Sequence, residues 1–287
     1  MENQRIYKIN SEALNFFRYN LKGEPLKYCK EVRKLSSKVI KDFQIGYAPN
    51  DFNYLINYLN KKGYTLNQME EAGLVSKTKN GRYIDFFRNR IIFPIFDIHQ
   101  NVIGFGGRVW EKDDNSPKYL NTVETPVFKK RTNLYGINRA KVAPNNCVIV
   151  CEGYMDCIAL QSNEFYGAVA GLGTALTTEQ CLLIKSLTDT VVLLYDGDSA
   201  GQQATEAAIT EFEAVGISPK IAQMRWAKDA DEFLKKYSKE KFQEIILDNA
   251  MSVTDYKLNL NLRKFGSEPE KIFEKNLNIA IKELLAM

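Results

Sequence analysis

The chain has 287 residues, of which 45% are hydrophobic and 26% are charged, and its formal net charge is +4. This length can bury a sizeable core, and we expect it to divide into two or three units. No 18-residue apolar stretch is present, which excludes a transmembrane helix, and the N-terminus lacks the apolar core of a signal peptide.

Cysteine and histidine are too sparse and too scattered to suggest a structural zinc site. No pair of cysteines shows CxxC spacing, and the only histidine is His99. Several cysteines lie in apolar runs, which indicates buried thiols in a reducing cytoplasm. We therefore expect a cytoplasmic protein with no zinc in this chain. The five cysteines are Cys29, Cys147, Cys151, Cys157 and Cys181.

Charge is distributed unevenly along the chain. Residues 82–141 contain eleven Lys or Arg and six Asp or Glu, whereas residues 146–201 contain seven Asp or Glu and one Lys. A basic region beside an acidic one suits a polyanion that is held next to a metal ion. Two unrelated solvated surfaces would give the same pattern, so charge alone leaves both alternatives open.

The first 75 residues or so are predicted to be mostly helical. Pro25 suits the first turn of a helix that continues through residues 26–35. The capping-box pattern of Thr65 and Gln68 predicts a short helix that ends near Gly73.

The hydrophobic period changes after Gly81. Residues 90–97 and 101–105 have the pattern of two strands joined by a short turn. Pro94 lies inside the first strand and has no amide hydrogen to donate, so it predicts an edge position or a bulge.

From Cys147 onward, strands are predicted to alternate with helices. The strands are residues 147–152, 166–170, 190–196 and 219–224, and the helices are about 154–163, 178–187 and 199–215. Thr177 and Gln180 form the capping box of the second helix. Alternation at this spacing predicts a parallel sheet with right-handed crossovers and flanking helices.

The overall expectation is an α/β fold, α+β when the whole chain is considered, in three units. Residues 1–140 are expected to form a mixed α/β unit with a basic surface, residues 146–238 the parallel-sheet unit, and residues 239–287 a helical unit. Ser267–Glu270 predicts a further helix start. The chain ends in a helical pattern, which suggests a fragment of a longer protein.

Pairs of acidic residues follow three of the four predicted strands. Each pair has an ordinary explanation, because an acid at a strand end often caps the following helix. That explanation is attractive for Asp198, whereas Asp196 has no comparable structural role. The pairs are Glu152 with Asp156, Asp196 with Asp198, and Asp229 with Asp231.

Three such pairs favour one shared metal site. Side chains at the carboxyl ends of parallel strands converge in one crevice outside the sheet. Carboxylates repel one another at short range, and a hard divalent cation such as Mg²⁺ removes that repulsion. Two such ions held ~4 Å apart can stabilise both the entering and the leaving oxygen of a displacement at phosphorus.

The basic region offers candidate contacts for phosphate, base and sugar. Cationic, aromatic and amide side chains together could bind a phosphate, stack a base and hydrogen bond a base edge. Each of them alone is also explained as an ordinary surface residue. A glycine loop at Ala170–Thr174 either cradles phosphate or makes a tight turn. The candidates are Arg88, Arg90, Arg108, Lys118, Tyr119, Asn121, Lys129, Lys130 and Arg131.

Two acidic motifs resemble the signatures of the Toprim domain, which is shared by bacterial primases, type IA and II topoisomerases, and some nucleases and recombination proteins. These motifs are residues 152–156 (EGYMD) and 196–201 (DGDSAG). The flanking sequence resembles, more narrowly, the bacterial DnaG-type primase. The resemblance runs from near Ile6 to the C-terminus, and the flanking segments that carry it are residues 90–94, 104–108, 117–121 and 134–136.

The resemblance implies a Toprim-type sheet within a DNA-dependent RNA polymerase domain. Such a domain makes short RNA primers from ribonucleoside triphosphates on a single-stranded DNA template, at the bacterial replication fork. The resemblance also implies possible inhibition by guanosine tetraphosphate alarmones at the nucleotide site. The implied catalytic residues, which would hold Mg²⁺ or Mn²⁺, are Glu152, Asp196 and Asp198. The other implied acidic positions are Asp156, Asp229 and Asp231. The implied basic ridge is Arg88, Arg90, Arg108, Lys118, Tyr119, Asn121 and Lys130, with Lys129 beside it.

Full-length members of this family also carry an N-terminal zinc-binding domain and a C-terminal domain that docks on the replicative helicase. This chain lacks both patterns, so we interpret it as the central catalytic domain. The helicase would then be a partner of the full-length protein only, and no membrane partner is expected. Two other hypotheses stay open, namely a Toprim enzyme that cleaves nucleic acid and a non-catalytic scaffold that binds it.

Overall fold

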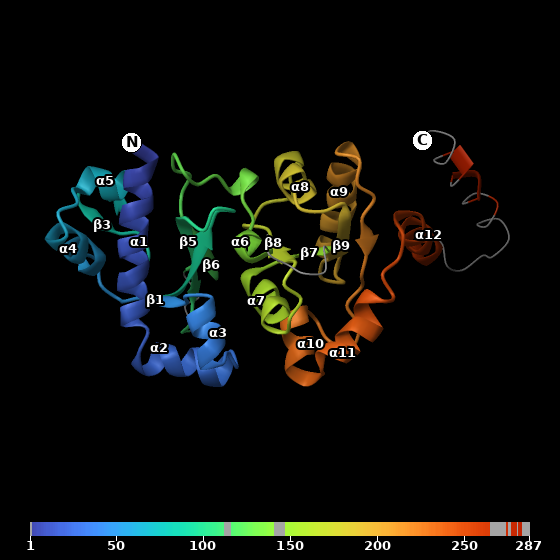
Figure 1. Cartoon of the computed structure of the whole chain (residues 1–287), viewed down its shortest axis with the longest axis horizontal. Coiled ribbons are helices and arrows are strands. Elements are labelled where there is room, and N and C mark those ends of the chain that lie inside the picture. The colour runs from blue at the N-terminus through green and yellow to red at the C-terminus, as the bar shows by residue number, and fades with distance from the viewer. Residues whose placement is uncertain are drawn as a thin grey trace.

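The computed structural model describes residues 2–111, 116–140 and 147–264, together with 274, 277–279, 281 and 282. Two sheets built from different parts of the chain lie side by side, with the N-terminal helices at one end of the molecule and α12 near the other (Figure 1). No helix in the described part of the chain is long and apolar enough to cross a membrane.

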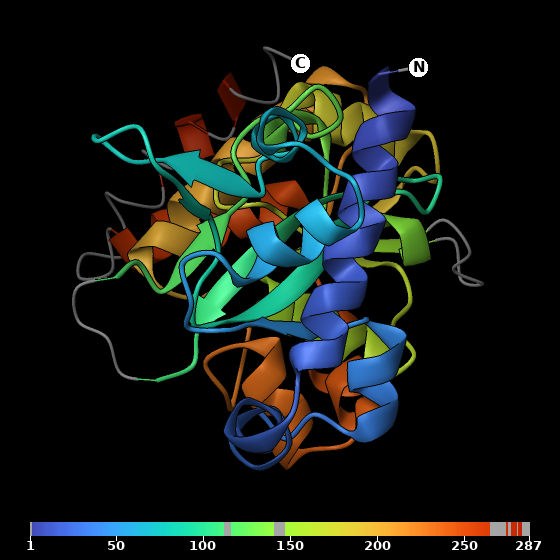
Figure 2. The same cartoon turned by 90° about the vertical axis from the view of Figure 1, so that its left-hand side faces the viewer.

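The N-terminal unit is organised around an antiparallel sheet with strand order β1-β4-β5-β6. Helix α1 (Glu2–Asn20) lies across this sheet (Figure 2). A side chain at Gly46 would overlap Phe17 of α1, so the glycine lets the helix approach β1 closely. The ring centroid of Phe17 lies 5.2 Å from that of Phe105, in the core beneath the helix. The strands are β1 (Gly46–Ala48), β4 (Arg90–Phe96), β5 (Val102–Val109) and β6 (Tyr119–Asn121).

Short helices and a hairpin surround this sheet. The capping box predicted at Thr65 and Gln68 is present, and Gly73 follows the helix with a φ of +69°. The strand β1 was missed, because three residues are too few to show a period. The remaining elements are α2 (Gly23–Lys27), the π-helix η1 (Tyr28–Val32), α3 (Ser37–Asp42), α4 (Tyr54–Lys61), α5 (Leu66–Glu71), β2 (Val75–Lys77) and β3 (Tyr83–Asp85).

Pro94 lies in a central strand of its sheet rather than in an edge strand. However, β1 pairs only with residues 90–92 of β4, so Pro94 lies beyond the end of β1 and is paired only with Phe105 of β5. The register between β4 and β5 shifts between Ile95 and Phe96. The missing amide hydrogen of Pro94 is thus tolerated because the strand is locally unpaired on one side.

The predicted parallel sheet is confirmed, with strand order β10-β9-β7-β8. Its strands are shorter than predicted because the apolar runs extend into the turns. They are β7 (Cys147–Cys151), β8 (Ala168–Ala170), β9 (Thr190–Leu194) and β10 (Lys220–Ile221). The accompanying helices are α6 (Ile137–Ala140), α7 (Tyr154–Ser162), α8 (Thr178–Lys185), α9 (Ser199–Ala214) and α10 (Ala230–Lys236), with a 3-10 turn η2 (Lys130–Thr132).

Both faces of the parallel sheet are covered, as the continuous apolar runs predict. Val148 and Val150 belong to one hydrophobic cluster, whereas Ile149 and Cys151 belong to another. Successive side chains of β7 therefore point to two different cores. Four of the five cysteines are buried, and all five are free thiols.

The two sheets share part of one core. The ring of Phe93 from β4 stacks on Tyr154 of α7, with centroids 5.3 Å apart. A side chain at Gly106 would overlap the Tyr154 ring, so this glycine allows α7 to pack against β5. The backbone of Tyr135 also pairs with Ala170 of β8. This shared core fixes the basic unit next to the parallel sheet.

The chain continues in helices after the parallel sheet, as predicted. They are α11 (Lys239–Phe242), the π-helix η3 (Gln243–Leu247) and α12 (Val253–Lys264). Met251 pairs with Ile221, which anchors this part of the chain to β10. The helix start predicted at residues 267–270 lies outside the described residues.

Candidate catalytic site

The strongest acidic candidates lie at the carboxyl ends of neighbouring strands. Glu152 follows β7 directly, and Asp196 lies two residues after the end of β9. The backbone amide of Asp196 donates a hydrogen bond to Glu152 Oε1 at 2.8 Å. This contact joins two strand ends that are 44 residues apart in sequence, and the charge of Glu152 acts on the Asp196 carboxylate.

Two further acids cap helices that begin at the same edge of the sheet. Asp198 Oδ1 accepts a hydrogen bond of 2.8 Å from the Gly201 amide at the start of α9. Asp229 Oδ1 accepts one of 2.7 Å from the Glu232 amide at the start of α10. The capping explanation for Asp198 is therefore confirmed. A cap occupies one carboxylate oxygen, so it is compatible with a metal contact through the other.

Burial and neighbouring negative charges raise the pKa values of two carboxyls in the acidic group. Burial, followed by the charges of Asp229, Asp231 and Asp196, raises the pKa of Asp156 to about 7, against a lowering by the hydrogen bond from the Asp231 amide. Burial, followed by the charges of Glu152 and Asp229, raises the pKa of Asp196 to about 6, against a lowering by Lys228. The pattern is that of carboxylates that need a cation to be fully ionised together.

Asp231 differs from the other acids because its charge is already balanced. Its Oδ2 lies 2.9 Å from Arg33 Nη2 and 2.6 Å from Lys235 Nζ, and its side chain is 10% exposed. Its amide donates to Asp156 Oδ1 at 3.3 Å. Asp231 therefore links α10 both to Asp156 and to a distant arginine.

The donor chemistry of this group fits a hard divalent cation. All donors are carboxylate oxygens, which Mg²⁺ and Mn²⁺ prefer. Within the described part of the chain, however, no three acidic, histidine or cysteine side chains are close enough to hold one ion as they stand. The six acids form an electrostatically coupled group whose side chains must turn inward to share an ion.

The basic strands face this acidic group. Arg108 Nη1 donates to the Tyr119 hydroxyl at 2.8 Å, with the guanidinium 5.3 Å from the ring centroid. Burial raises the pKa of Tyr119, and the charges of Arg108, Arg33 and Asp156 also act on it, with Arg108 and Arg33 lowering it and Asp156 raising it. Because Asp156 and Arg33 both act on Tyr119, this part of the basic unit lies beside the carboxylates.

Asn121 is held by two hydrogen bonds. Its Nδ2 donates to the Leu172 carbonyl at 2.7 Å, and its Oδ1 accepts from the Tyr154 hydroxyl at 2.6 Å. It thereby ties β6 to α7 and to the glycine loop at 170–174, in which Gly173 has a φ of +80°. The loop therefore forms a tight turn, and the hydrogen bond from Asn121 to the Leu172 carbonyl holds its backbone in place.

The remaining basic candidates differ in exposure. Arg90 is 5% exposed and donates to the carbonyls of Gly107 and Pro117, at 3.1 and 2.9 Å. That burial points to a scaffold role in the sheet. Arg88 is half-buried, donates to the Asp85 carbonyl and lies over the Phe52 ring. Lys118, Lys129 and Arg131 are exposed, and Lys130 is half-buried.

Two arginines near the site keep unused donors. The Nε atoms of Arg33 and Arg108 are buried and have no hydrogen-bond partner within the described residues. A buried unpaired N–H costs about 1–3 kcal/mol, and an anionic ligand would satisfy it. Arg33 was missed in the sequence, because it lies 198 residues from Asp231 and nothing local marks it.

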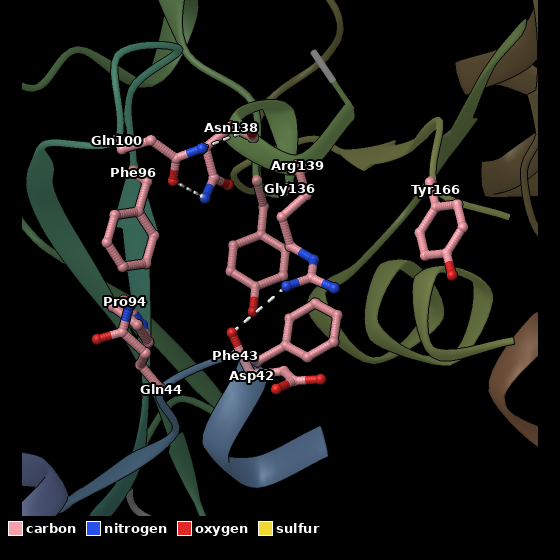
Figure 3. A pocket seen from close by; sticks show the side chains of 11 residues that line it. Asp42, Phe43, Gln44, Pro94, Phe96, Gln100, Gly136, Asn138, Arg139 and Tyr166 are labelled. Carbon is pink, nitrogen blue, oxygen red and sulfur yellow. Dashed lines mark hydrogen bonds between the residues drawn. The ribbon is translucent and has the colours of Figure 1, made fainter. Parts of the chain in front are cut away.

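A separate pocket is lined mainly by residues of the first 140, together with Tyr166 (Figure 3). Its volume is about 530 Å³, and no predicted site residue lines it. In its wall Asn138 Nδ2 donates to Gln100 Oε1, and Gln100 Nε2 donates to the backbone carbonyl of Asn138. The Arg139 guanidinium lies 4.5 Å from the Phe43 ring centroid. The buried Nε of Arg139 has no hydrogen-bond partner within the described residues, but none of the six acids lines this pocket.

Removing Arg33 is expected to destabilise the protein through Asp231. In Arg33→Met, Asp231 keeps a buried charge with one cation fewer, and we expect the free energy of unfolding to fall by about 3 kcal/mol. Chemical denaturation of the single variants and of Arg33→Met/Asp231→Asn measures the coupling. The double variant should recover most of the loss, and purely additive losses would contradict the ion pair.

Gly201 is expected to be essential for the position of Asp196. A Cβ at Gly201 would overlap the Asp196 carbonyl oxygen, whereas one at Gly197 would meet nothing within 4 Å. Gly201→Ala should therefore lower the free energy of unfolding by about 3 kcal/mol, because backbone must move. Gly197→Ala is the matched control, and thermal melts with equal losses for both would refute this packing argument.

Comparison with known proteins agrees with these features. The family model described as the DNA primase catalytic core, N-terminal domain, matches residues 16–141, and a Toprim-like model matches residues 149–234. The DNA primase of Clostridium acetobutylicum is 42% identical over 286 residues, which cover 98% of this chain and 47% of that protein. The chain thus spans about half the length of this curated relative.

Solved structures give the same result. A DNA primase domain from Pseudomonas aeruginosa is 32% identical, with a TM-score of 0.82 over 90% of this chain and 83% of that one. A DnaG primase catalytic domain bound to single-stranded DNA is also 32% identical, with a TM-score of 0.82 over 92% and 84% of the two chains. This chain belongs to the bacterial DnaG primase family and comprises the mixed α/β catalytic core with its Toprim sheet. A Toprim domain implies the use of a divalent metal ion.

Proposed function

We propose that this chain is the RNA polymerase domain of a bacterial primase, which makes short RNA primers on single-stranded DNA. The observation that carries the proposal is the acidic group at the strand ends, in which Asp156 lies near enough to Tyr119, the partner of Arg108, for its charge to act on that tyrosine. Carboxylates beside cations suit a triphosphate substrate, because the acids hold metal and the arginines contact phosphate oxygens. The family relationship supports the same reaction.

In this proposal the metal is Mg²⁺, with Mn²⁺ able to substitute. Glu152, Asp196 and Asp198 would hold it, with Asp156 and Asp229 in support, and Asp231 would act as the anchor of α10. The bound ion would polarise phosphate oxygens and lower the pKa of the attacking hydroxyl. The 3′-hydroxyl of the growing RNA would attack the α-phosphate of the incoming ribonucleotide and release pyrophosphate.

The chain's own residues would position the reactants. The hydrogen bond from the Asp196 amide to Glu152 orients two carboxylates before substrate arrives. The unused Nε–H groups of Arg33 and Arg108 would donate hydrogen bonds to oxygens of the triphosphate. Arg88, Lys118, Lys129 and Lys130 would contact template or nucleotide phosphates, whereas Arg90 would hold β4 and β5 in place. The related domain bound to single-stranded DNA supports a template of this kind.

Primer synthesis tests the proposal directly. Ribonucleotides, a single-stranded DNA template and either Mg²⁺ or Mn²⁺ should yield short RNA products with the purified chain, and EDTA should abolish them. Cleaved template or a covalent DNA–protein adduct would favour a Toprim nuclease or topoisomerase. Metal-independent binding without any product, even after the parts of a full-length relative outside the matched segment are added in trans, would favour a scaffold.

A further inference from the structure

Trp226 is exposed in the loop between β10 and α10. Its side chain is 58% exposed, and its backbone has a φ of +67°, in the left-handed region that non-glycine residues rarely adopt. Such strain costs about 1–3 kcal/mol and gathers at functional sites. An exposed indole on a strained loop therefore suggests that the ring is presented to a ligand.

A second aromatic ring and a cation accompany Trp226. The ring centroid of Tyr237, at the end of α10, lies 5.6 Å from that of Trp226. Lys241 Nζ from α11 lies 5.9 Å from the Trp226 centroid and 6.0 Å from that of Tyr237. We call Trp226, Tyr237 and Lys241 the aromatic platform. Three different segments build it, so it depends on the tertiary fold.

The charge around the platform is positive. Residues 220–241 contain seven Lys or Arg and four Asp or Glu. Three of these cations, Lys235, Lys236 and Lys239, form ion pairs. The other four are exposed and form no ion pair within the described residues, and they are Lys220, Arg225, Lys228 and Lys241. Of the acids, Asp229 and Glu232 are engaged by helix-start amides, and Asp231 is paired with Arg33.

The same loop borders the candidate catalytic site. The charge of Lys228 acts on Asp196, and a pocket of about 230 Å³ is lined by Asp196, Gly197, Met224 and Arg225. Trp226 is three residues along the chain from Asp229, in the segment that follows the end of β10. Arg225, the residue before Trp226, therefore lines the same pocket as Asp196.

We propose that the aromatic platform binds single-stranded nucleic acid, with one base stacked on Trp226 and the flanking phosphates near Lys241 and Arg225. Every base has a face that can stack on an indole, so this contact would be tolerant of sequence. The exposed cations argue against a purely apolar ligand, and the exposed indole ring argues against a ligand bound by charge alone. This inference rests on the proposed function, because it assigns a path for a strand that approaches the acidic group.

Fluorescence of Trp226 tests the proposal without any chemistry. The chain has two tryptophans, so Trp110→Phe leaves Trp226 as the only indole reporter. Titration of this variant with oligothymidylate in EDTA should quench its fluorescence as a base stacks on the ring. If Trp110→Phe does not fold, the difference between wild type and Trp226→Phe gives the same signal.

Binding of a labelled oligothymidylate, followed by anisotropy, gives the affinity. Trp226→Ala should weaken binding about tenfold, because stacking of one base contributes roughly 1–3 kcal/mol, and Trp226→Phe should recover part of the loss. Tyr166→Ala is the matched control, since Tyr166 is 37% exposed but precedes β8 at the opposite end of the sheet. That variant should bind as wild type does.

The outcomes separate this inference from the function itself. Normal anisotropy binding with no change in Trp226 fluorescence would overturn the platform and leave the primase proposal intact. Quenching by ribonucleoside triphosphate alone, with no response to oligothymidylate, would also overturn it in favour of a nucleotide contact. If the wild-type protein binds no oligothymidylate at all, both the nucleic-acid role of the aromatic platform and the proposed function would be contradicted.

Discussion

Asp196→Asn is expected to reduce primer synthesis at least roughly a thousandfold, which corresponds to about 4 kcal/mol of transition-state stabilisation. Asp196 interacts with four of the other acids, since Glu152, Asp229 and Asp198 act on its charge and it acts on Asp156. Asparagine keeps the shape and the backbone but removes the charge that would hold metal. Product formation from ribonucleotides on single-stranded DNA, with Mg²⁺ at several concentrations, measures the loss.

The same substitution should not weaken the fold. Like charges crowd around Asp196, so removing one of them relieves repulsion, and the melting temperature in EDTA should stay equal or rise. Asp189→Asn is the matched control, because Asp189 is exposed just before β9, at the other end of the same strand. Normal synthesis by Asp196→Asn, or an equal loss in the Asp189 variant, would contradict the site.

The free energy of unfolding of the metal-free protein is expected to fall as pH rises from about 5 to about 8. Asp156 should contribute roughly 2 kcal/mol to this fall, once solvent screening of its charge is allowed for. Its pKa is raised to about 7 in the folded chain, against an ordinary value near 4 when unfolded. A raised pKa means that the folded state holds the proton more tightly. The stabilisation is complete below the unfolded pKa and is lost as pH rises through about 7.

Divalent metal should reverse this dependence. Bound Mg²⁺ favours the ionised carboxylates, so it should stabilise the protein increasingly above pH ~6 and flatten the decline. Thermal melts in EDTA and in Mg²⁺ across this range measure the effect. Asp85, whose pKa is raised to about 6, contributes in the same direction. The difference between wild type and Asp156→Asn isolates Asp156, and an identical pH profile for the two would contradict its assignment.

The parallel sheet could be predicted from the sequence because the residues that indicate its strands and helices lie within those elements or next to them. Apolar runs at 147–151 and 190–194, the capping box at Thr177 and acids directly after the strands all lie within a few residues of what they specify. Parallel topology then brings Glu152 and Asp196 together, which their hydrogen bond reflects. The candidate site was predictable to that extent because strand ends on one edge must converge.

Roles that depend on distant partners could not be read in this way. Nothing near Arg90 indicates that it would be buried among carbonyls of β5 and the following loop rather than exposed to phosphate. The amide of Asn121 is a plausible base contact in sequence, but Tyr154 and Leu172 occupy it in the fold. Burial is a property of packing, and packing is decided by residues far apart in the chain.

The sequence by itself determined the alternating strands and helices of the parallel sheet and the acids at its edge, because hydrophobic period, caps and strand-end residues act over short distances. Only the tertiary structure decided that Arg33 neutralises Asp231 and that Trp226, Tyr237 and Lys241 share one surface. These groups meet because the shared core docks the N-terminal unit and the last helices around the parallel sheet. Electrostatic and stacking interactions depend on distances of a few ångströms, and folding alone sets those distances.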